Sequence, residues 1–244
     1  MTLISIIIPY YKKRYYIRQT LQSILKQDYK HFEILLIYDD EDQSDLVLLK
    51  NLSKIDKRIK LIINKKNIGA GMSRNKAIKL SKGNYIAFID ADDIWHPKKL
   101  KKQIDFMKKN QIHMSHTSYY IVNENNKKIG FREAKEIKFK NLLKSCDIGL
   151  STVMIKKRLL KNNFFPSLKT KEDYVLWLSL TKKKYTFFSI KKPLTSWRSL
   201  DNSLSSSLIQ KLMDGYHVYR IYMRQSVLQS IKSLFVLSIN FLKK

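Results

Sequence analysis

Cysteine, glycine and proline are all scarce in this chain of 244 residues, which contains one cysteine, six glycines and four prolines. The single cysteine, Cys146, excludes a disulfide framework and a cysteine-rich zinc site. So few glycines and prolines, together with 44% hydrophobic residues, exclude a collagen-like or disordered chain. The sequence therefore predicts a globular protein of a reducing compartment, and we expect it in the cytoplasm.

Acidic residues are also few, with 20 Asp and Glu against 48 Lys and Arg, and the formal net charge is +28. Such a charge is compatible with binding to nucleic acid, an anionic membrane or an anionic substrate. Most of the excess is lysine, at 39 against 9 arginines, whereas bidentate recognition of phosphates and bases favours arginine. A basic nucleic-acid-binding protein stays as an alternative, but we expect no nucleic acid as a partner.

No hydrophobic run is long enough to cross a membrane, since Lys232 interrupts the apolar segment near the C-terminus. The apolar stretch of residues 3–8 ends at Pro9 and has no basic region before it, so it predicts a strand rather than a signal peptide. Any membrane contact is therefore peripheral. Residues 226–242 either pack on the domain, which we favour slightly, or lie on an anionic membrane surface at the inner face of the membrane.

Apolar runs and amphipathic patterns alternate in the first half of the chain. Runs rich in β-branched and aromatic residues predict strands at residues 4–8, 34–38, 59–63 and 85–89. Apolar stripes between them predict helices around residues 17–25, 46–52 and 73–80. This alternation predicts an α/β, Rossmann-like fold with a mostly parallel sheet flanked by helices, in which ligands bind beyond the carboxyl ends of the strands.

The second half of the chain has a mixed pattern. Pro97 suits the first turn of a helix whose apolar positions are Leu100, Ile104 and Met107. Further strands are predicted at residues 115–122, 150–155, 185–190 and 194–198, a helix at residues 173–180, and only helix from residue 208 onward. We therefore expect one domain at residues 1–205, with halves at 1–93 and 94–205, and a C-terminal helical tail at residues 206–244.

The residues that follow the predicted strands are acidic rather than glycine-rich. The loop after residue 8 has no glycine, so it cannot form the phosphate-binding turn of dinucleotide or P-loop sites. Instead, eight of the 20 acidic residues follow the second and fourth strands: Asp39, Asp40, Glu41, Asp42, Asp45, Asp90, Asp92 and Asp93. Like charges this close together favour a bound cation.

Asp90, Asp92 and Asp93 offer only oxygen ligands, and no cysteine lies nearby, which suits Mg²⁺ or Mn²⁺ rather than zinc. Such a metal usually shares its coordination shell with phosphate. The predicted ligand is therefore a diphosphate, whose departure the metal would ease as a Lewis acid. An alternative is that Asp92 or Asp93 caps the helix entered at Pro97, which would account for only one of the three acids.

Six segments of the chain occur in an order typical of one enzyme family. They are residues 5–11, Asp39-Asp40, residues 67–75, residues 90–95, residues 172–177, and Arg198 ahead of residues 202–205. Over about residues 3–205 the sequence thus resembles the family 2 glycosyltransferases, which have a GT-A fold. The chain departs from the common family pattern at Lys12 and at Glu41-Asp42, which predicts a different nucleobase loop. It also departs at Leu200, where many members have a histidine, which weakens the expectation of a diphosphate contact near Arg198.

The resemblance implies a role for each matching residue. Pro9, Tyr11 and Asp39 would border the nucleobase pocket, with Asp40 sharing the role of Asp39 in accepting a base N–H. Asp90 and Asp92 would form the family's DxD motif, which holds the metal and the sugar nucleotide. The other implied donor-binding residues are Asn67, Gly71, Arg74, Ala91 and Arg198. Ordinary packing stays open for Tyr11, and a surface ion pair stays open for Arg74.

Asp173 matches the catalytic base of the family. An ionised carboxylate within reach of an acceptor hydroxyl can take its proton as the oxygen attacks the anomeric carbon. The residues alone favour Glu172 and Asp173 as acids in the first turn of a helix, where the helix dipole stabilises them, and only the family match reverses that preference.

The function that these features imply is an inverting hexosyltransferase-type glycosyltransferase (EC 2.4). It would move a sugar from a nucleoside diphosphate donor, with UDP-sugar as the first candidate, to a hydroxyl of a saccharide or lipid-linked saccharide acceptor. Such a reaction belongs to the synthesis of a surface polysaccharide or similar glycoconjugate. A metal-dependent nucleotidyltransferase on a similar sheet is a second alternative. The presence of both Asp92 and Asp173 argues against an inactive relative.

Overall fold

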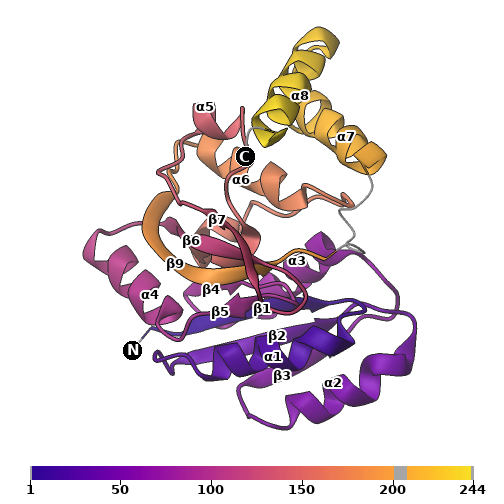
Figure 1. Cartoon of the computed structure of the whole chain (residues 1–244), viewed down its shortest axis with the longest axis vertical. Coiled ribbons are helices and arrows are strands. Elements are labelled where there is room, and N and C mark those ends of the chain that lie inside the picture. Colours follow the sequence, from indigo (N-terminus) through magenta and orange to yellow (C-terminus); the bar gives the residue numbers. More distant parts are fainter. Residues whose placement is uncertain (1, 201–207, 243–244) are drawn as a thin grey trace.

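The computed structural model describes residues 2–200 and 208–242. In the first half, strands and helices alternate as the sequence predicts (Figure 1). The elements are β1 (Ile4–Tyr10), α1 (Arg14–Leu25), β2 (Phe32–Tyr38), α2 (Leu46–Ser53), β3 (Ile59–Ile63), α3 (Ala70–Leu80) and β4 (Tyr85–Phe88).

In the second half the elements are shorter and less regular. They are β5 (Ile94–Trp95), α4 (Lys99–Lys109), β6 (Met114–Val122), β7 (Lys128–Arg132), α5 (Phe139–Leu142), β8 (Met154–Lys156), α6 (Glu172–Lys182) and β9 (Phe188–Arg198).

The strands of the described residues form one sheet in the order β3-β2-β1-β4-β8-β6-β9-β5, with β7 beside β6. β1 pairs with β2 and β4, and β2 pairs with β3, and all three pairings are parallel. Beyond β4 the sheet is mixed, because β8 runs antiparallel to both β4 and β6, whereas β6 and β9 are parallel. The carboxyl ends of β1 to β4 therefore meet at one edge of the sheet, where the sequence predicts the ligand.

Several predicted details of the second half are wrong. Residues 150–155 are not one strand, because Leu150–Thr152 forms a 3₁₀-helix before β8 begins. The strands predicted at residues 185–190 and 194–198 are one strand, β9, whose pairing with β6 shifts register around Ser118. Pro97 precedes α4 instead of lying in its first turn. β5, β7 and α5 escaped prediction because they are too short or too exposed to show a hydrophobic period.

Two apolar layers cover the two faces of the sheet. Successive residues of β1 point to opposite faces, so Ile6 and Ile8 pack with α1, α2 and α4, whereas Ile7 packs with α3 and α6. All seven residues of β1 are buried. Burial on both faces explains why the central strands are continuous apolar runs, and it holds the carboxyl edge of the sheet in place from both sides.

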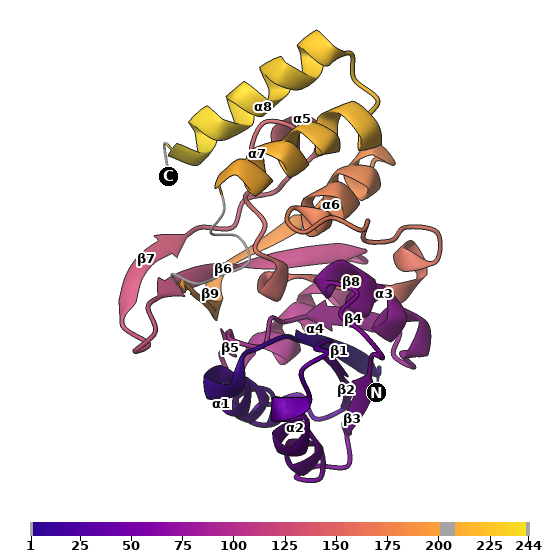
Figure 2. The same ribbon diagram turned by 90° about the vertical axis from the view of Figure 1, so that its right-hand side faces the viewer.

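The C-terminal tail is helical over the part that the structure describes. α7 (Leu208–His217) runs into a π-helical turn (Val218–Tyr222), and α8 (Val227–Leu242) packs beside them on the outside of the molecule (Figure 2). Val218, Tyr219 and Leu237 join the same apolar layer as α6. The tail therefore packs on the domain. The expected boundary at 205/206 and the segment 202–205 lie outside the described residues.

None of the helices in residues 2–200 and 208–242 is long and apolar enough to cross a membrane.

Candidate active site at the carboxyl edge of the sheet

Asp39 organises the loops that follow β2 and β3. Its Oδ1 accepts hydrogen bonds from Asn64 Nδ2 at 2.8 Å and from the backbone N–H of Ile68 at 2.9 Å. Asp39 is buried, as is Asp40, whose Oδ1 accepts from the backbone N–H of Asp42. The two acids predicted for the nucleobase pocket thus lie at the expected edge, and the loop that leads into α3 is tied to one of them.

The remaining residues predicted around the nucleobase differ in exposure. Pro9 is buried within β1, and Tyr11 lies just past its end, half-buried, with Lys12 Nζ 5.3 Å from the ring centroid. Asn67 is exposed, and its Oδ1 accepts from the backbone N–H of Gly69. Because β1 and β2 pair in parallel through Tyr10 and Tyr38, the backbone at Tyr11 leaves the sheet next to the loop that begins at Asp39.

Arg74 joins two parts of the chain that are far apart in sequence. This residue of α3 is buried, and its guanidinium donates to Asp90 Oδ1 at 2.7 Å and to Glu172 Oε1 at 2.6 Å. It also lies 5.5 Å from the centroid of the Phe165 ring. The surface ion pair left open for Arg74 is therefore wrong: the side chain is a buried link between the end of β4 and the start of α6.

Asp92 and Asp93 have different surroundings. Asp92 forms an ion pair with Lys13 at 2.8 Å. Asp93 is fully buried and accepts from the backbone N–H of Arg198 at 2.8 Å, while its Oδ2 has no hydrogen-bond partner among the described residues. Neither caps α4, whose N-terminal cap position is Lys98, without a side-chain hydrogen bond, so the capping alternative is wrong. Burial raises the pKa of Asp92, and it raises the pKa of Asp93 well above its usual range, with repulsion from Asp92 adding to the shift.

The acids after β4 fit a divalent cation that is completed by other ligands. Asp90 and Asp92 already hold a guanidinium and an ammonium, respectively, which shows that each attracts a cation. No cluster of three or more His, Cys, Asp or Glu side chains in the described part of the chain could hold a metal alone. Mg²⁺ and Mn²⁺ are commonly held by one or two carboxylates, with water and substrate phosphates filling the remaining positions. Two carboxylates match that pattern.

Asp173 lies at the start of α6, beside the Arg74 link. Its Oδ1 accepts from the backbone N–H of Tyr174 at 2.7 Å. Burial raises the pKa of Asp173 to about 7, repulsion from Glu172 adds to the shift, and attraction to Arg74 opposes it. A carboxyl group with a pKa near neutral pH is well suited to accept a proton. Its position in the first helical turn agrees equally with the helix-dipole alternative.

Arg198 has partners other than the predicted diphosphate. Its Nε donates to the backbone carbonyl of Asp92 at 2.8 Å, and its guanidinium lies 4.6 Å from the centroid of the Tyr16 ring. The four remaining N–H groups donate to Asn123 O, Glu124 O, Gln19 Oε1 and Asn126 Oδ1. Since all five N–H groups of the side chain are engaged, the structure favours a positioning role for Arg198. It joins the end of β9 to the loop after β4 that contains Asp92.

The places of Gly71 and Ala91 in the structure follow from the atoms around them. A Cβ atom at Gly71 would lie 3.0 Å from Glu172 Cγ and 3.0 Å from the carbonyl oxygen of Pro166, so glycine lets α3 approach the start of α6 closely. Ala91 is buried, and its carbonyl oxygen accepts from the hydroxyl of Thr20 at 3.0 Å. Both residues therefore shape the backbone of the predicted donor site.

Comparison with known proteins decides the family. A family model described as Glycosyl transferase family 2 matches residues 5–168, more than half of the chain. The chain belongs to glycosyl transferase family 2. It is therefore an enzyme, a glycosyltransferase, as the order of the sequence motifs predicts.

Two curated glycosyltransferases match most of the chain. The putative teichuronic acid biosynthesis glycosyltransferase TuaG of Bacillus subtilis (strain 168) is 34% identical over 220 residues, which cover 89% of this chain and 87% of TuaG. The Escherichia coli protein WfgD is named a UDP-Glc:alpha-D-GlcNAc-diphosphoundecaprenol beta-1,3-glucosyltransferase. It is 38% identical over 217 residues, which cover 88% of this chain and 85% of WfgD.

Solved structures share the fold. The crystal structure of S. aureus TarS in complex with UDP-GlcNAc has a TM-score of 0.74 at 22% identity, covering 96% of this chain and 70% of that one. The mannosyltransferase PcManGT from Pyrobaculum calidifontis, in complex with GDP-Man and Mn²⁺, has a TM-score of 0.70 at 14% identity, covering 95% and 69%. The predicted GT-A fold of this family 2 glycosyltransferase is confirmed.

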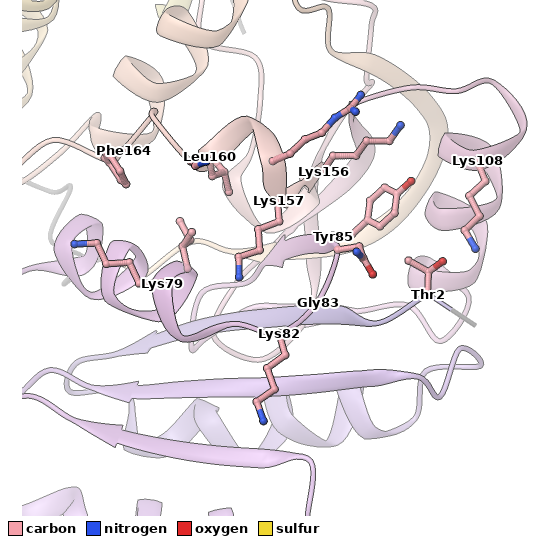
Figure 3. A pocket seen from close by; sticks show the side chains of 14 residues that line it. Thr2, Lys79, Lys82, Gly83, Tyr85, Lys108, Lys156, Lys157, Leu160 and Phe164 are labelled. Atoms are coloured by element: carbon pink, nitrogen blue, oxygen red, sulfur yellow. The ribbon is translucent and has the colours of Figure 1, made fainter.

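A basic groove lies at the other edge of the sheet (Figure 3). It has a volume of about 960 Å³ and is lined around the beginning of β4 and the end of β8, with Lys82, Lys157 and Phe164 among its residues. Two of its other lysines, Lys79 and Lys108, lie in the last turns of α3 and α4, where a positive charge complements the helix dipole. Since the acids of the glycosyltransferase motifs lie at the carboxyl edge, we do not place the donor here.

Three residues contact the predicted site residues through partners that the sequence did not predict. Lys13 pairs with Asp92, Glu172 pairs with Arg74, and Asn64 donates to Asp39. Lys13 and Asn64 lie in loops without a periodic pattern, and Lys13 is one of 39 lysines. Glu172 stood in a recognised motif, but its partner lies 98 positions away in the sequence. Only the folded chain identifies these pairs.

Proposed function

We propose that this glycosyltransferase moves a sugar from a nucleoside diphosphate sugar to an acceptor hydroxyl in a single displacement that inverts the anomeric centre. The observation that carries the proposal is the Arg74 link. It connects Asp90, at the edge where the donor is expected, with the start of α6, where burial raises the pKa of Asp173 to about 7. The predicted donor site is thereby linked to Glu172, the residue next to the candidate proton acceptor.

The donor would lie along the carboxyl ends of β1, β2 and β4. We assign Asp39 and Asp40 to accept base N–H groups and Tyr11 to border the base, with Asn67 at the rim. Asp90 and Asp92 would hold Mg²⁺ or Mn²⁺, as their oxygen ligands suit either ion. When bound, this ion would supply positive charge that stabilises the leaving nucleoside diphosphate.

In the chemical step, Asp173 would accept the proton of the acceptor hydroxyl while that oxygen forms a bond to the anomeric carbon. The bond from this carbon to the diphosphate oxygen breaks at the same time, and its electron pair leaves with the nucleoside diphosphate. Attack opposite to the leaving group inverts the centre. Arg74 keeps a positive charge between Asp90 and Glu172 and so limits the repulsion that Asp173 experiences.

The curated relatives suggest the substrates. WfgD is named for UDP-Glc as donor and a diphosphoundecaprenol-linked acceptor, and TuaG for teichuronic acid biosynthesis. We therefore propose a UDP-sugar donor, a lipid-linked saccharide acceptor and a role in surface polysaccharide synthesis. An enzyme with such substrates would work in the cytoplasm, at the inner face of the membrane.

The donor proposal predicts metal-dependent binding of one nucleotide. We expect UDP to bind the wild type in the presence of Mn²⁺, and Asp92→Asn to weaken that binding by roughly tenfold or more, since even the partners of metal ligands contribute 10- to 100-fold to metal affinity. Titration calorimetry with UDP, GDP, dTDP and CDP, each with and without Mn²⁺, measures this.

The control is Asp105→Asn, because Asp105 is an exposed acid on α4 that pairs only with Lys101 at 3.0 Å among the ion pairs of the described residues. This variant should bind as the wild type does. Binding of no nucleotide, together with salt-sensitive binding of an oligonucleotide, would overturn the proposal in favour of nucleic-acid binding. Release of pyrophosphate in place of a nucleoside diphosphate would indicate a nucleotidyltransferase.

A further inference from the structure

Exposed apolar side chains gather on the C-terminal helices. Nine of the twenty large hydrophobic side chains that are exposed among the described residues lie in this short part of the chain. They are Ile209, Leu212, Met213, Ile221, Val227, Leu228, Ile231, Phe235 and Phe241. Figures 1 and 2 show α7 and α8 at the outside of the molecule, at the end away from β1, β2 and β3. Such a concentration marks an interaction surface.

α8 has two apolar faces, and folding uses only one of them. On the inner face, Leu237 is buried in the apolar layer of α6, and Leu234 approaches Gly215 so closely that a Cβ there would lie 2.8 Å from its Cδ1. On the outer face, Leu228, Ile231 and Phe235 follow one another at helical spacing and are 81%, 54% and 65% exposed. We call these three residues the outer face of α8.

The surface of this region carries positive but no negative charge. In residues 208–242 the one acidic residue is Asp214, which is buried and accepts from the backbone N–H and the hydroxyl of Thr170, each at 2.8 Å. The basic side chains Arg220, Arg224 and Lys232 are exposed. Apolar side chains flanked by cations, without acids, are typical of helices that lie in the interface of an anionic membrane.

We propose that the outer face of α8 docks this protein on an anionic phospholipid bilayer, with α8 lying along the membrane surface. A second copy of the chain fits this face less well, because a symmetric contact would bring the same cations together with no acid to compensate them. The inference rests on the proposed function in one respect: a membrane surface is where a lipid-linked acceptor would be found.

The test uses the full-length protein and vesicles, without donor or acceptor. We expect the wild type to sediment with vesicles that contain phosphatidylglycerol and phosphatidylcholine, and far less with phosphatidylcholine alone. The double variant Ile231→Ser/Phe235→Ser should lower the partition coefficient at least about tenfold, since each apolar side chain adds to interfacial binding. Lys232→Gln should lower it about fivefold on the anionic vesicles only.

The matched control is Val47→Ser/Ile55→Ser, which removes two exposed apolar side chains far from α8 in the sequence, at 67% and 60% exposure. It should bind vesicles as the wild type does. Failure of the wild type to bind anionic vesicles, or equal binding by the outer-face variant, would overturn the inference. So would a dimer in light scattering that the outer-face variant abolishes.

Nucleotide binding by calorimetry separates this inference from the proposed function. The outer-face variant should bind UDP and Mn²⁺ as the wild type does. If the wild type binds vesicles but no nucleotide, the donor proposal fails and the membrane inference stands. If it binds the nucleotide but no vesicles, the membrane inference fails and the donor proposal stands.

Discussion

Replacing Asp173 with asparagine is expected to lower kcat by about 10²–10⁴-fold, the usual contribution of a positioned general base. Asparagine has nearly the same shape but cannot take up the proton of the acceptor hydroxyl. UDP should bind the variant with the affinity that it has for the wild type, because Asp173 is assigned to the acceptor and not to the donor. Initial rates of nucleoside diphosphate release, with calorimetry of UDP binding, give the two quantities.

The pH dependence gives a second readout for Asp173. Burial and Glu172 raise its pKa to about 7, and the base acts only when it is deprotonated. For the wild type, kcat/KM for the donor should therefore fall as pH decreases through about 7 and level off above it. The decrease of kcat/KM toward low pH should be absent from Asp173→Asn. Asp105→Asn, on the exposed side of α4, should keep both the rate and the profile. If Asp173→Asn keeps them too, Asp173 has no part in the mechanism.

Replacing Arg74 with methionine should have the largest effect on stability. The change would leave Asp90 and Glu172 without their shared cation in a site where the Glu172 side chain is only 13% exposed. Losing one partner of a buried ion pair costs about 3–5 kcal/mol. We expect about 3 kcal/mol, because Asp90 is 35% exposed and retains solvent. Denaturant unfolding measures the loss as a lower midpoint.

Two variants check this cause. Arg74→Met/Glu172→Gln removes one of the two uncompensated charges, so it should recover part of the lost free energy of unfolding. Lys101→Met breaks an exposed i, i+4 pair with Asp105 and should cost only about 0.3–0.5 kcal/mol. Equal losses in Arg74→Met and Lys101→Met would contradict the buried link. Because Arg74 lowers the pKa of Asp173, the acidic limb of any remaining activity should also move to higher pH.

The predictions from sequence were most reliable where the chain is buried on both faces. β1, β2 and β4 are apolar runs because α1, α2 and α4 cover one face and α3 and α6 the other. The predictions were less reliable around β8 and β9. There β8 pairs antiparallel with β6, and the pairing of β6 with β9 shifts register, so the sequence has no regular hydrophobic period. A 3₁₀-helix at Leu150–Thr152 contains the same kinds of residue as a buried strand, and only its neighbours distinguish the two.

The amino-acid sequence alone determined the alternation of strands and helices, the family, and the acids at the carboxyl edge, because these follow from local pattern and from the order of motifs. The tertiary structure decided which acidic side chain pairs with which basic side chain. Arg74 pairs with both Asp90 and Glu172, and Lys13 pairs with Asp92. The side-chain N–H groups of Arg198 all donate to neighbouring loops or to Gln19 of α1. It also decided that α8 buries one apolar face and exposes the other. Such pairings depend on distances between residues that are remote in the chain, and sequence spacing does not contain those distances.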